Sequence, residues 1–134
     1  MSGDLAAALR AAAALVEAGD PDRFAACRLL DPGARDRLLP LYALNLEIAR
    51  APWAAREPFV AEMRLQWWVD ALEALRDGGG APAHEIGPAL VPLRDQAGLM
   101  IALAEARRRD CWLEGFADGA ALDAYLAETA GHLA

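Results

Sequence analysis

The chain has 134 residues, 56% of them hydrophobic, with a net charge of -7 and a pI near 4.7, and all 13 of its basic residues are arginines. An acidic chain without a basic stripe is excluded as a nucleic-acid binder, so we expect no nucleic-acid partner. No apolar run reaches the roughly 18 residues of a transmembrane segment. The first residues do not form a signal peptide, so we predict a cytoplasmic protein, with peripheral attachment to a membrane as the alternative.

Alanine and leucine dominate the sequence while β-branched residues are scarce, which favours helices over strands. We therefore predict an all-α fold, a helical bundle, in one domain that covers residues 1–134. The two cysteines, Cys27 and Cys111, lack the spacing of a metal or redox motif. They are predicted to be small buried side chains.

Three helices are predicted in the first part of the chain, beginning with one over about residues 5–18. Asp20-Pro21 and Asp31-Pro32 each combine an N-cap residue with a proline that suits the first turn, so they are expected to open the second and third helices. Pro40 lies inside the third helix and is expected to kink or break it. Pro52 is expected to end it.

The remaining elements are also predicted as helices, separated by one flexible loop. They are a helix from Glu57-Pro58 to about Asp77, the loop at 77–83, a shorter helix over 85–98 ended by Gly98, a longer helix over 99–116, and a last helix over 122–134. The last helix keeps an amphipathic stripe to the final residue without a glycine or proline stop. This pattern predicts that the chain is a fragment of a longer protein, with a short terminal helix that frays as the alternative.

The residues that usually carry chemistry give little signal by themselves. His84 and His132 have no second ligand at zinc spacing and are predicted to be ordinary surface residues. Acidic pairs four residues apart, such as Glu73 and Asp77, are more typical of a solvated helix face than of a metal site. Ser2 is the only serine, which excludes a serine nucleophile.

The segment EMRLQWWVDAL, residues 62–72, places two tryptophans side by side on the fourth helix. Neighbours on a helix point about 100° apart, so Trp67 and Trp68 widen the apolar sector beyond that of a surface helix. We predict that this helix is either enclosed in a bundle or faces a cavity. Arg64 would then need a partner, for which a buried ion pair is the first interpretation and an anionic ligand the second.

Four segments in order resemble the squalene/phytoene synthase family over about residues 20–134. They are DRFAACRLLDPGARDRLLPLYALNLEIAR, EMRLQWWVDAL, LAEARRRDCW and LDAYLAETAG. The resemblance implies an all-α isoprenoid synthase fold, of which this chain is similar to the N-terminal half. It also implies the family reaction, the head-to-head joining of two prenyl diphosphates held through Mg²⁺ by two aspartate-rich helices.

The same resemblance implies roles for individual residues. Tyr125 matches the tyrosine that lines the reaction cavity and is the candidate catalytic residue. Arg64, Trp67, Trp68 and Tyr42 are the candidates for binding an isoprenoid diphosphate or a similar apolar ligand. No metal ligand is assigned.

The sequence departs from the family pattern where the first aspartate-rich motif should stand. Leu46 replaces an arginine, and Ala49 and Arg50 replace the aspartate pair, so we expect that this chain does not bind Mg²⁺. The second motif should lie beyond Gly131, which is three residues from the end of the chain. If the chain is active, it is a prenyltransferase, but the lost motif puts its catalytic competence in doubt.

Two other functions stay open. The combination of LNLEIA and MRLQWW is closer to the branch that lacks the aspartates, whose members are non-catalytic assembly factors for respiratory complex I. The high hydrophobic content is also compatible with a helical module that associates with itself or with a partner protein through exposed apolar faces.

Overall fold

The computed structural model describes residues 3–54 and 57–111, and every regular element within them is helical, which confirms the all-α fold class. The elements are α1 (Gly3–Gly19), α2 (Pro21–Cys27), α3 (Pro32–Ala54), α4 (Pro58–Arg76), α5 (Gly87–Leu90), the 3₁₀ segment η1 (Val91–Gln96), α6 (Ala97–Ala106) and α7 (Arg108–Cys111). None of these helices combines the length and apolar character that a membrane crossing requires.

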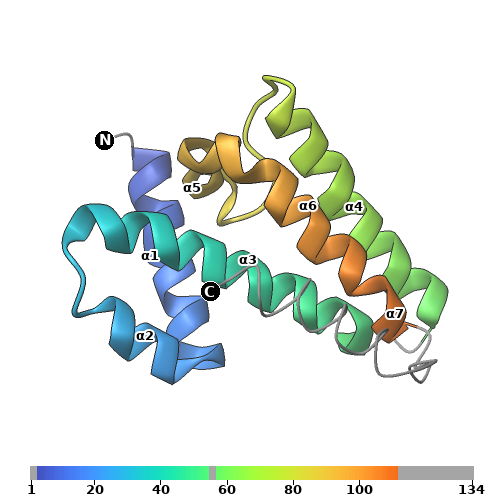
Figure 1. Cartoon of the computed structure of the whole chain (residues 1–134), viewed down its shortest axis with the longest axis horizontal. Coiled ribbons are helices and arrows are strands. Elements are labelled where there is room, and N and C mark those ends of the chain that lie inside the picture. Colours follow the sequence, from blue (N-terminus) through green and yellow to red (C-terminus); the bar gives the residue numbers. More distant parts are fainter. Residues whose placement is uncertain (1–2, 55–56, 112–134) are drawn as a thin grey trace.

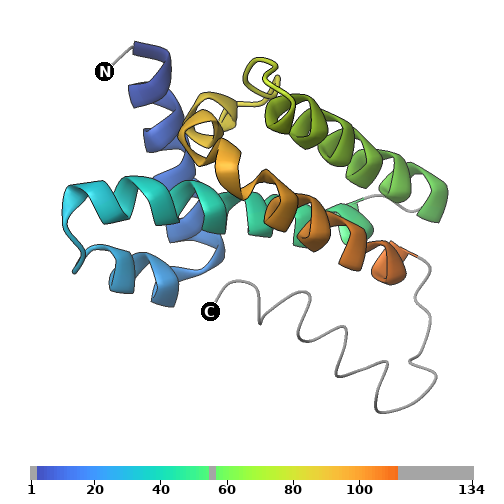
Figure 2. The same cartoon turned by 45° about the horizontal axis from the view of Figure 1, so that its top comes forward.

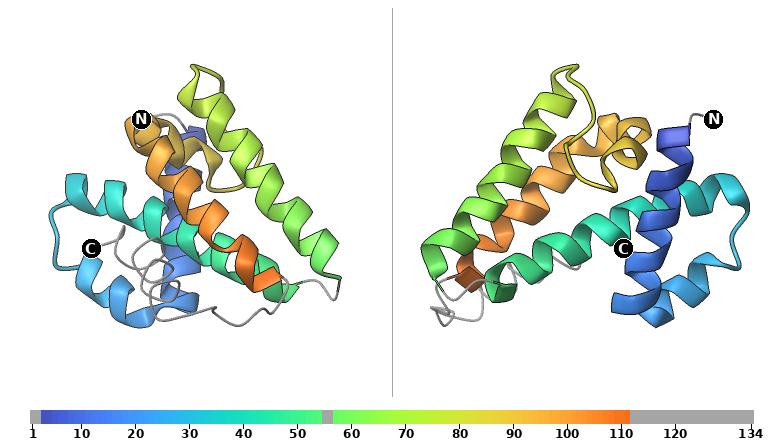
Figure 3. Two further views of the ribbon diagram at one scale, coloured as in Figure 1. Left: turned by 45° about the vertical axis from the view of Figure 1, so that its right-hand side comes forward. Right: turned by 180° about the vertical axis from the view of Figure 1, so that it is seen from behind.

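The long helix α3 is the element on which the others pack (Figure 1). α4 and α6 lie side by side, as both views of Figure 3 show, and together they pack on the C-terminal half of α3. α1 crosses α3, with the short helix α2 beside it (Figure 2). The connection between α4 and α5 returns the chain along α4, toward α3.

The predicted starts of α2, α3 and α4 are confirmed. Asp20 caps α2, because its Oδ1 accepts a hydrogen bond of 3.2 Å from the backbone N–H of Arg23. Asp31 does the same for α3, accepting from the N–H of Ala34 at 3.1 Å. α4 begins at Pro58, directly after Glu57. In each case the first residue of the helix is a proline, whose fixed φ suits a helix.

The predicted end of α3 at Pro52 is wrong, and Pro40 does not break the helix. α3 continues through both prolines to Ala54. Pro40 is fully buried, between core residues Leu39 and Ala43. Proline removes one helical hydrogen bond, but the packing of this apolar stretch outweighs that loss.

The predicted helix over 85–98 is also wrong, because the structure divides it. α5 ends at Leu90, a 3₁₀ segment follows, and Leu93 inside it has non-helical dihedrals of φ -101 and ψ 18. Pro88 and Pro92 supply no N–H, which weakens a continuous α-helix here. Gly98 does not end a helix but lies in the first turn of α6.

The core lies where α3, α4 and α6 meet. Its largest fully buried side chains include Leu44, Ile48, Leu65, Leu72 and Met100. α4 contributes one face of its helix to this core and leaves the opposite face outside. The predicted burial of Cys27 and Cys111 is confirmed, with exposed fractions of 2% and 3%. Burial raises the pKa of the Cys27 thiol, an effect that nearby Arg35 opposes.

Asn45 is the buried polar residue of α3. Its side-chain oxygen accepts no hydrogen bond from the described residues, although only 8% of the residue is exposed. We predict that Asn45→Leu raises the free energy of unfolding by about 1 kcal/mol, because an unpaired polar group is exchanged for an apolar one of similar shape. Urea unfolding would measure the change, with the exposed Gln96→Leu as control. A loss of stability in Asn45→Leu would contradict the prediction.

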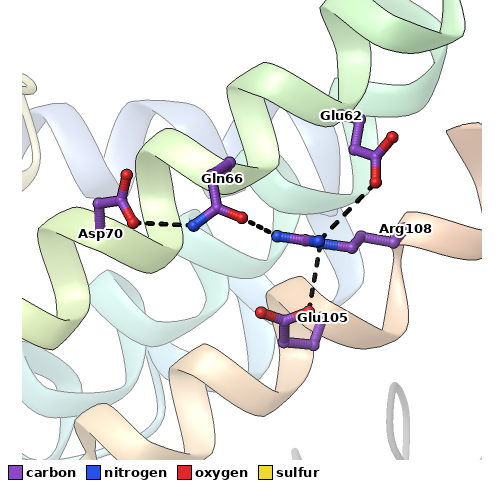
Figure 4. Close-up of polar contacts among 5 residues, drawn as sticks. All are labelled: Glu62, Gln66, Asp70, Glu105 and Arg108. Carbon is purple, nitrogen blue, oxygen red and sulfur yellow. Dashed lines mark hydrogen bonds and ion pairs between the residues drawn. The ribbon is translucent and has the colours of Figure 1, made fainter.

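Arg108 joins α7 to α4 through several polar contacts (Figure 4). Its guanidinium lies 3.7 Å from a carboxylate oxygen of Glu62 and 3.2 Å from one of Glu105. It also donates a hydrogen bond to Gln66, whose amide nitrogen donates to Asp70 at 2.8 Å. The contacts therefore connect α4 with α7 and with Glu105 at the end of α6.

We predict that Arg108→Met lowers the free energy of unfolding by about 1 kcal/mol, since the ion pairs are partly solvated and only part of their energy is net stabilisation. Thermal unfolding followed by circular dichroism would measure the loss. Arg10→Met, at an exposed position of α1, is the matched control and should leave the midpoint unchanged. Equal midpoints for both variants would show that the contacts around Arg108 do not stabilise the fold.

Candidate functional site

A pocket of about 370 Å³ lies between α3, α4 and the loop that follows α4. This volume is in the usual range for small-molecule sites, roughly 300–1,000 Å³. Its lining is Glu47, Arg50 and Ala51 from α3, Arg64, Trp67 and Trp68 from α4, and Ala83 and His84 from the loop. The site thus combines two indole rings with two guanidinium groups.

The adjacent tryptophans take different environments. Trp68 is 5% exposed and belongs to the core, whereas Trp67 is 42% exposed. Their ring centroids are 4.9 Å apart and the ring planes meet at 82°, an edge-to-face arrangement. Trp68 therefore anchors the wall of the pocket, and Trp67 offers a ring that a ligand can contact.

The loop after α4 brings His84 onto Trp68. The turn begins at Gly78, whose φ of +95 suits glycine. The imidazole centroid lies 5.1 Å from the Trp68 ring centroid, and its Nδ1 accepts a hydrogen bond of 3.2 Å from the N–H of Ile86. His84 is three-quarters buried and lines the pocket, so its prediction as an ordinary surface residue is wrong. The prediction failed because the loop returns along α4, a path that the periodicity of the sequence does not indicate.

Glu47 lies between a guanidinium group and an imidazole ring in the pocket. One of its carboxylate oxygens is 3.7 Å from His84 Nε2, and the other is 4.0 Å from Arg50 Nη1. Both distances exceed those of direct charge-assisted hydrogen bonds, which are about 2.7–2.9 Å. The carboxylate is therefore shared by Arg50 and His84 rather than held tightly by one of them.

Arg64 has no ion-pair partner among the residues that the structure describes, and it is exposed. The predicted buried ion pair of Arg64 is therefore wrong. The prediction assumed that α4 is apolar on most sides, but α4 buries the face that carries Leu65, Trp68 and Leu72. Arg64 lies outside that face, where water solvates its charge.

The opposite face of α4 carries a row of exposed apolar side chains, here called the apolar ridge. It consists of Phe59, Val60, Met63 and Trp67, with exposed fractions of 66%, 42%, 56% and 42%. The fourth helix is thus not enclosed within the described part of the chain. It faces the pocket at Trp67 and solvent along the rest of the ridge.

The structure brings together three of the five residues that the sequence assigns to a site. Arg64, Trp67 and Trp68 line the same pocket. Tyr42 lies elsewhere on α3, with the Arg23 guanidinium carbon 5.0 Å from its ring centroid. Tyr125 is outside the described residues. The pocket roles of Glu47 and His84 were not predicted, because neither residue belongs to a motif with a fixed spacing.

The pocket is poor in metal ligands. Within residues 3–54 and 57–111, no three histidine, cysteine or acidic side chains gather in a way that could hold a metal ion. Glu47 is the one carboxylate among the lining residues given above, and its oxygens already face Arg50 and His84. The chemistry of this set therefore favours binding an anion over binding a cation.

Together the fold and the pocket define an all-α protein with an aromatic, arginine-edged cavity between its helices. The family model for squalene/phytoene synthase matches residues 16–134 of the chain. The protein therefore belongs to the squalene/phytoene synthase family, as its sequence motifs predicted. No curated protein and no solved structure matches the chain significantly.

Proposed function

We propose that this family member binds an isoprenoid-type apolar chain in the pocket between α3 and α4, without itself joining two prenyl diphosphates. Membership of the family suggests a place in isoprenoid biosynthesis. The observation that carries the proposal is the pocket itself, in which the exposed ring of Trp67 stands beside Arg64 and Arg50. An apolar surface edged by cationic groups suits a ligand with a hydrocarbon body and a charged end.

We propose that the chain lacks condensation activity because its acidic Mg²⁺ ligands are missing. The family reaction requires acidic residues that hold Mg²⁺ against the leaving diphosphate. On α3 this chain has Leu46, Ala49 and Arg50 where the motif of the family would place an arginine and two aspartates. Arg50 lines the pocket and would repel a divalent cation there.

Calorimetric titration with farnesol, below the concentration at which it aggregates, would test the binding. We expect saturable binding, weakened about tenfold in Trp67→Ala because the ligand loses an aromatic contact surface. Trp53→Ala is the matched control, since Trp53 is also exposed but lies outside the pocket lining. Equal losses in both variants, or no saturable binding, would contradict the proposal.

Incubation with farnesyl diphosphate and Mg²⁺ would test the second part. We expect neither diphosphate release nor a condensed C30 product. Turnover that persists in the purified chain, and disappears in a pocket variant such as Trp67→Ala, would show that the protein is an enzyme despite its altered motif.

A second candidate is the non-catalytic assembly role for respiratory complex I, and the apolar ridge favours it. Four large apolar side chains exposed in a row are typical of a surface that contacts another protein. Deletion of the gene should then reduce complex I assembly, and a copy carrying Phe59→Ser and Met63→Ser should fail to restore it. Full restoration by that copy, with normal protein levels, would exclude this use of the ridge.

A further inference from the structure

We infer that the pocket recognises a phosphate ester directly through Arg50 and Arg64, without a divalent cation, and that the carboxylate of Glu47 occupies the place of that anion when no ligand is bound. This inference rests on the proposed function, because it names the head group of the ligand that the same pocket takes. It concerns the phosphate end alone and can fail while the binding of the apolar chain stands.

The charges of the lining carry the first step. Arg50 and Arg64 contribute two permanent positive charges, against the single negative charge of Glu47. The pocket is therefore positive in a chain whose net charge is -7. Guanidinium groups present several N–H donors in a plane, which suits the oxygens of a phosphate. A positive site of this kind attracts an anion and disfavours Mg²⁺.

The placement of Arg50 carries the second step. A Cβ added at Gly19, the last residue of α1, would lie 3.0 Å from Arg50 Nη2. The guanidinium is thus positioned between the end of α1 and the pocket, beside the Glu47 carboxylate one helical turn away. Arg64 reaches the same pocket from α4, so an anion between α3 and α4 could contact both groups.

The looseness of the Glu47 contacts carries the third step. Its oxygens lie 4.0 Å from Arg50 and 3.7 Å from His84, so neither contact is an optimal hydrogen bond. A phosphate with more oxygens and more charge can approach the guanidinium groups more closely and displace this carboxylate. Glu47 then acts as an internal competitor, and its removal should strengthen binding rather than weaken it.

Calorimetric titration in EDTA, with farnesyl monophosphate, farnesol and inorganic pyrophosphate as separate probes, tests the inference. We expect the monophosphate to bind at least about tenfold more tightly than farnesol, with no gain on adding Mg²⁺. Arg50→Gln and Arg64→Gln should each remove most of this difference, measured as the ratio of the two affinities within the same variant. Arg10→Gln, outside the pocket, should change neither affinity.

Glu47→Gln is the variant that separates this inference from a simple loss of charge. It should bind the monophosphate about threefold or more tightly, because the competing carboxylate is gone. All four positions are at least partly exposed and the variants are expected to fold, which circular dichroism would confirm.

The outcomes distinguish the two proposals. A monophosphate that binds no better than farnesol, or binds only with Mg²⁺, would overturn the inference and leave the proposed function intact. Pyrophosphate that binds as tightly as the monophosphate, and loses affinity in both arginine variants, would support the inference and contradict the apolar ligand. Binding of none of the three probes would overturn both.

Discussion

Replacing Trp68 by alanine is expected to lower the free energy of unfolding by about 3–5 kcal/mol, whereas the same change at Trp67 should lower it by less than about 1 kcal/mol. The two residues are neighbours of identical chemistry, so their difference measures environment alone. Trp68 is 5% exposed and packs in the core beside the buried Leu65 and Leu72, and removing its ring leaves a cavity. Trp67 is 42% exposed, and alanine in its place improves helix propensity.

Urea unfolding of the two variants would measure these losses of stability. Titration of the folded variants with farnesol would measure their losses of affinity. Trp67→Ala should lose affinity with little loss of stability. Trp68→Ala should lose both, because its ring supports His84 and the pocket wall. Similar unfolding midpoints for the two variants would show that the assignment of one ring to the core and the other to the pocket is wrong.

The sequence could predict that two adjacent tryptophans need two environments, but not which ring takes which. The 3.6-residue period places them on neighbouring faces of α4, and this follows from helix geometry alone. Which face is buried depends on where α3 and α6 pack, and that is a property of the whole fold. The exposure of Arg64 was unpredictable for the same reason, because it depends on which face of α4 packs against the other helices.

Helix starts were predictable because their causes are local. Asp20 and Asp31 each supply a capping oxygen to an N–H three residues ahead, so neighbouring residues contain the whole cause. The helix break expected at Pro40 does not form because core contacts hold α3 together there, which is an effect of distant packing. Gly98 was expected to end a helix but lies in the first turn of α6.

The polar part of the site was the least predictable from the sequence. Glu47 and His84 are 37 positions apart and meet only because the chain after α4 returns toward α3. Neither belongs to a motif with a fixed spacing, so no local pattern joins them. The sequence singled out Arg50 because it stands where the family has an aspartate. Only the structure shows that Arg50 lies beside Glu47 in the pocket.

Gly87→Ala is expected to be as damaging as a core deletion, lowering the free energy of unfolding by about 3 kcal/mol or more. A Cβ at this position would overlap the carbonyl oxygen of Pro82 and stand 2.9 Å from its carbonyl carbon. Both obstacles are backbone atoms, so no side-chain rotation can relieve the clash. The φ of Gly87 is not in the left-handed region, and the effect is therefore steric rather than conformational.

The matched control is Gly98→Ala in α6. An added Cβ there has nothing within 4 Å, and alanine favours helix over glycine by about 1 kcal/mol, so this variant should be slightly more stable than the parent. Thermal unfolding of both variants under the same conditions would place the parent between them. Equal midpoints for the two variants would contradict the close approach of Pro82 to Gly87.

The same substitution also tests how the pocket is held. Gly87 lets the loop lie against α5, and that loop carries Ala83 and His84 into the pocket lining. If the protein yields locally, the loop that carries His84 shifts, and Gly87→Ala should show a smaller stability loss together with weaker binding of farnesol. If the loop is integral to the fold, stability falls by the full amount and binding at low temperature stays near that of the parent. Parent-like stability together with parent-like binding would mean that the loop, and with it His84, is not fixed by Gly87.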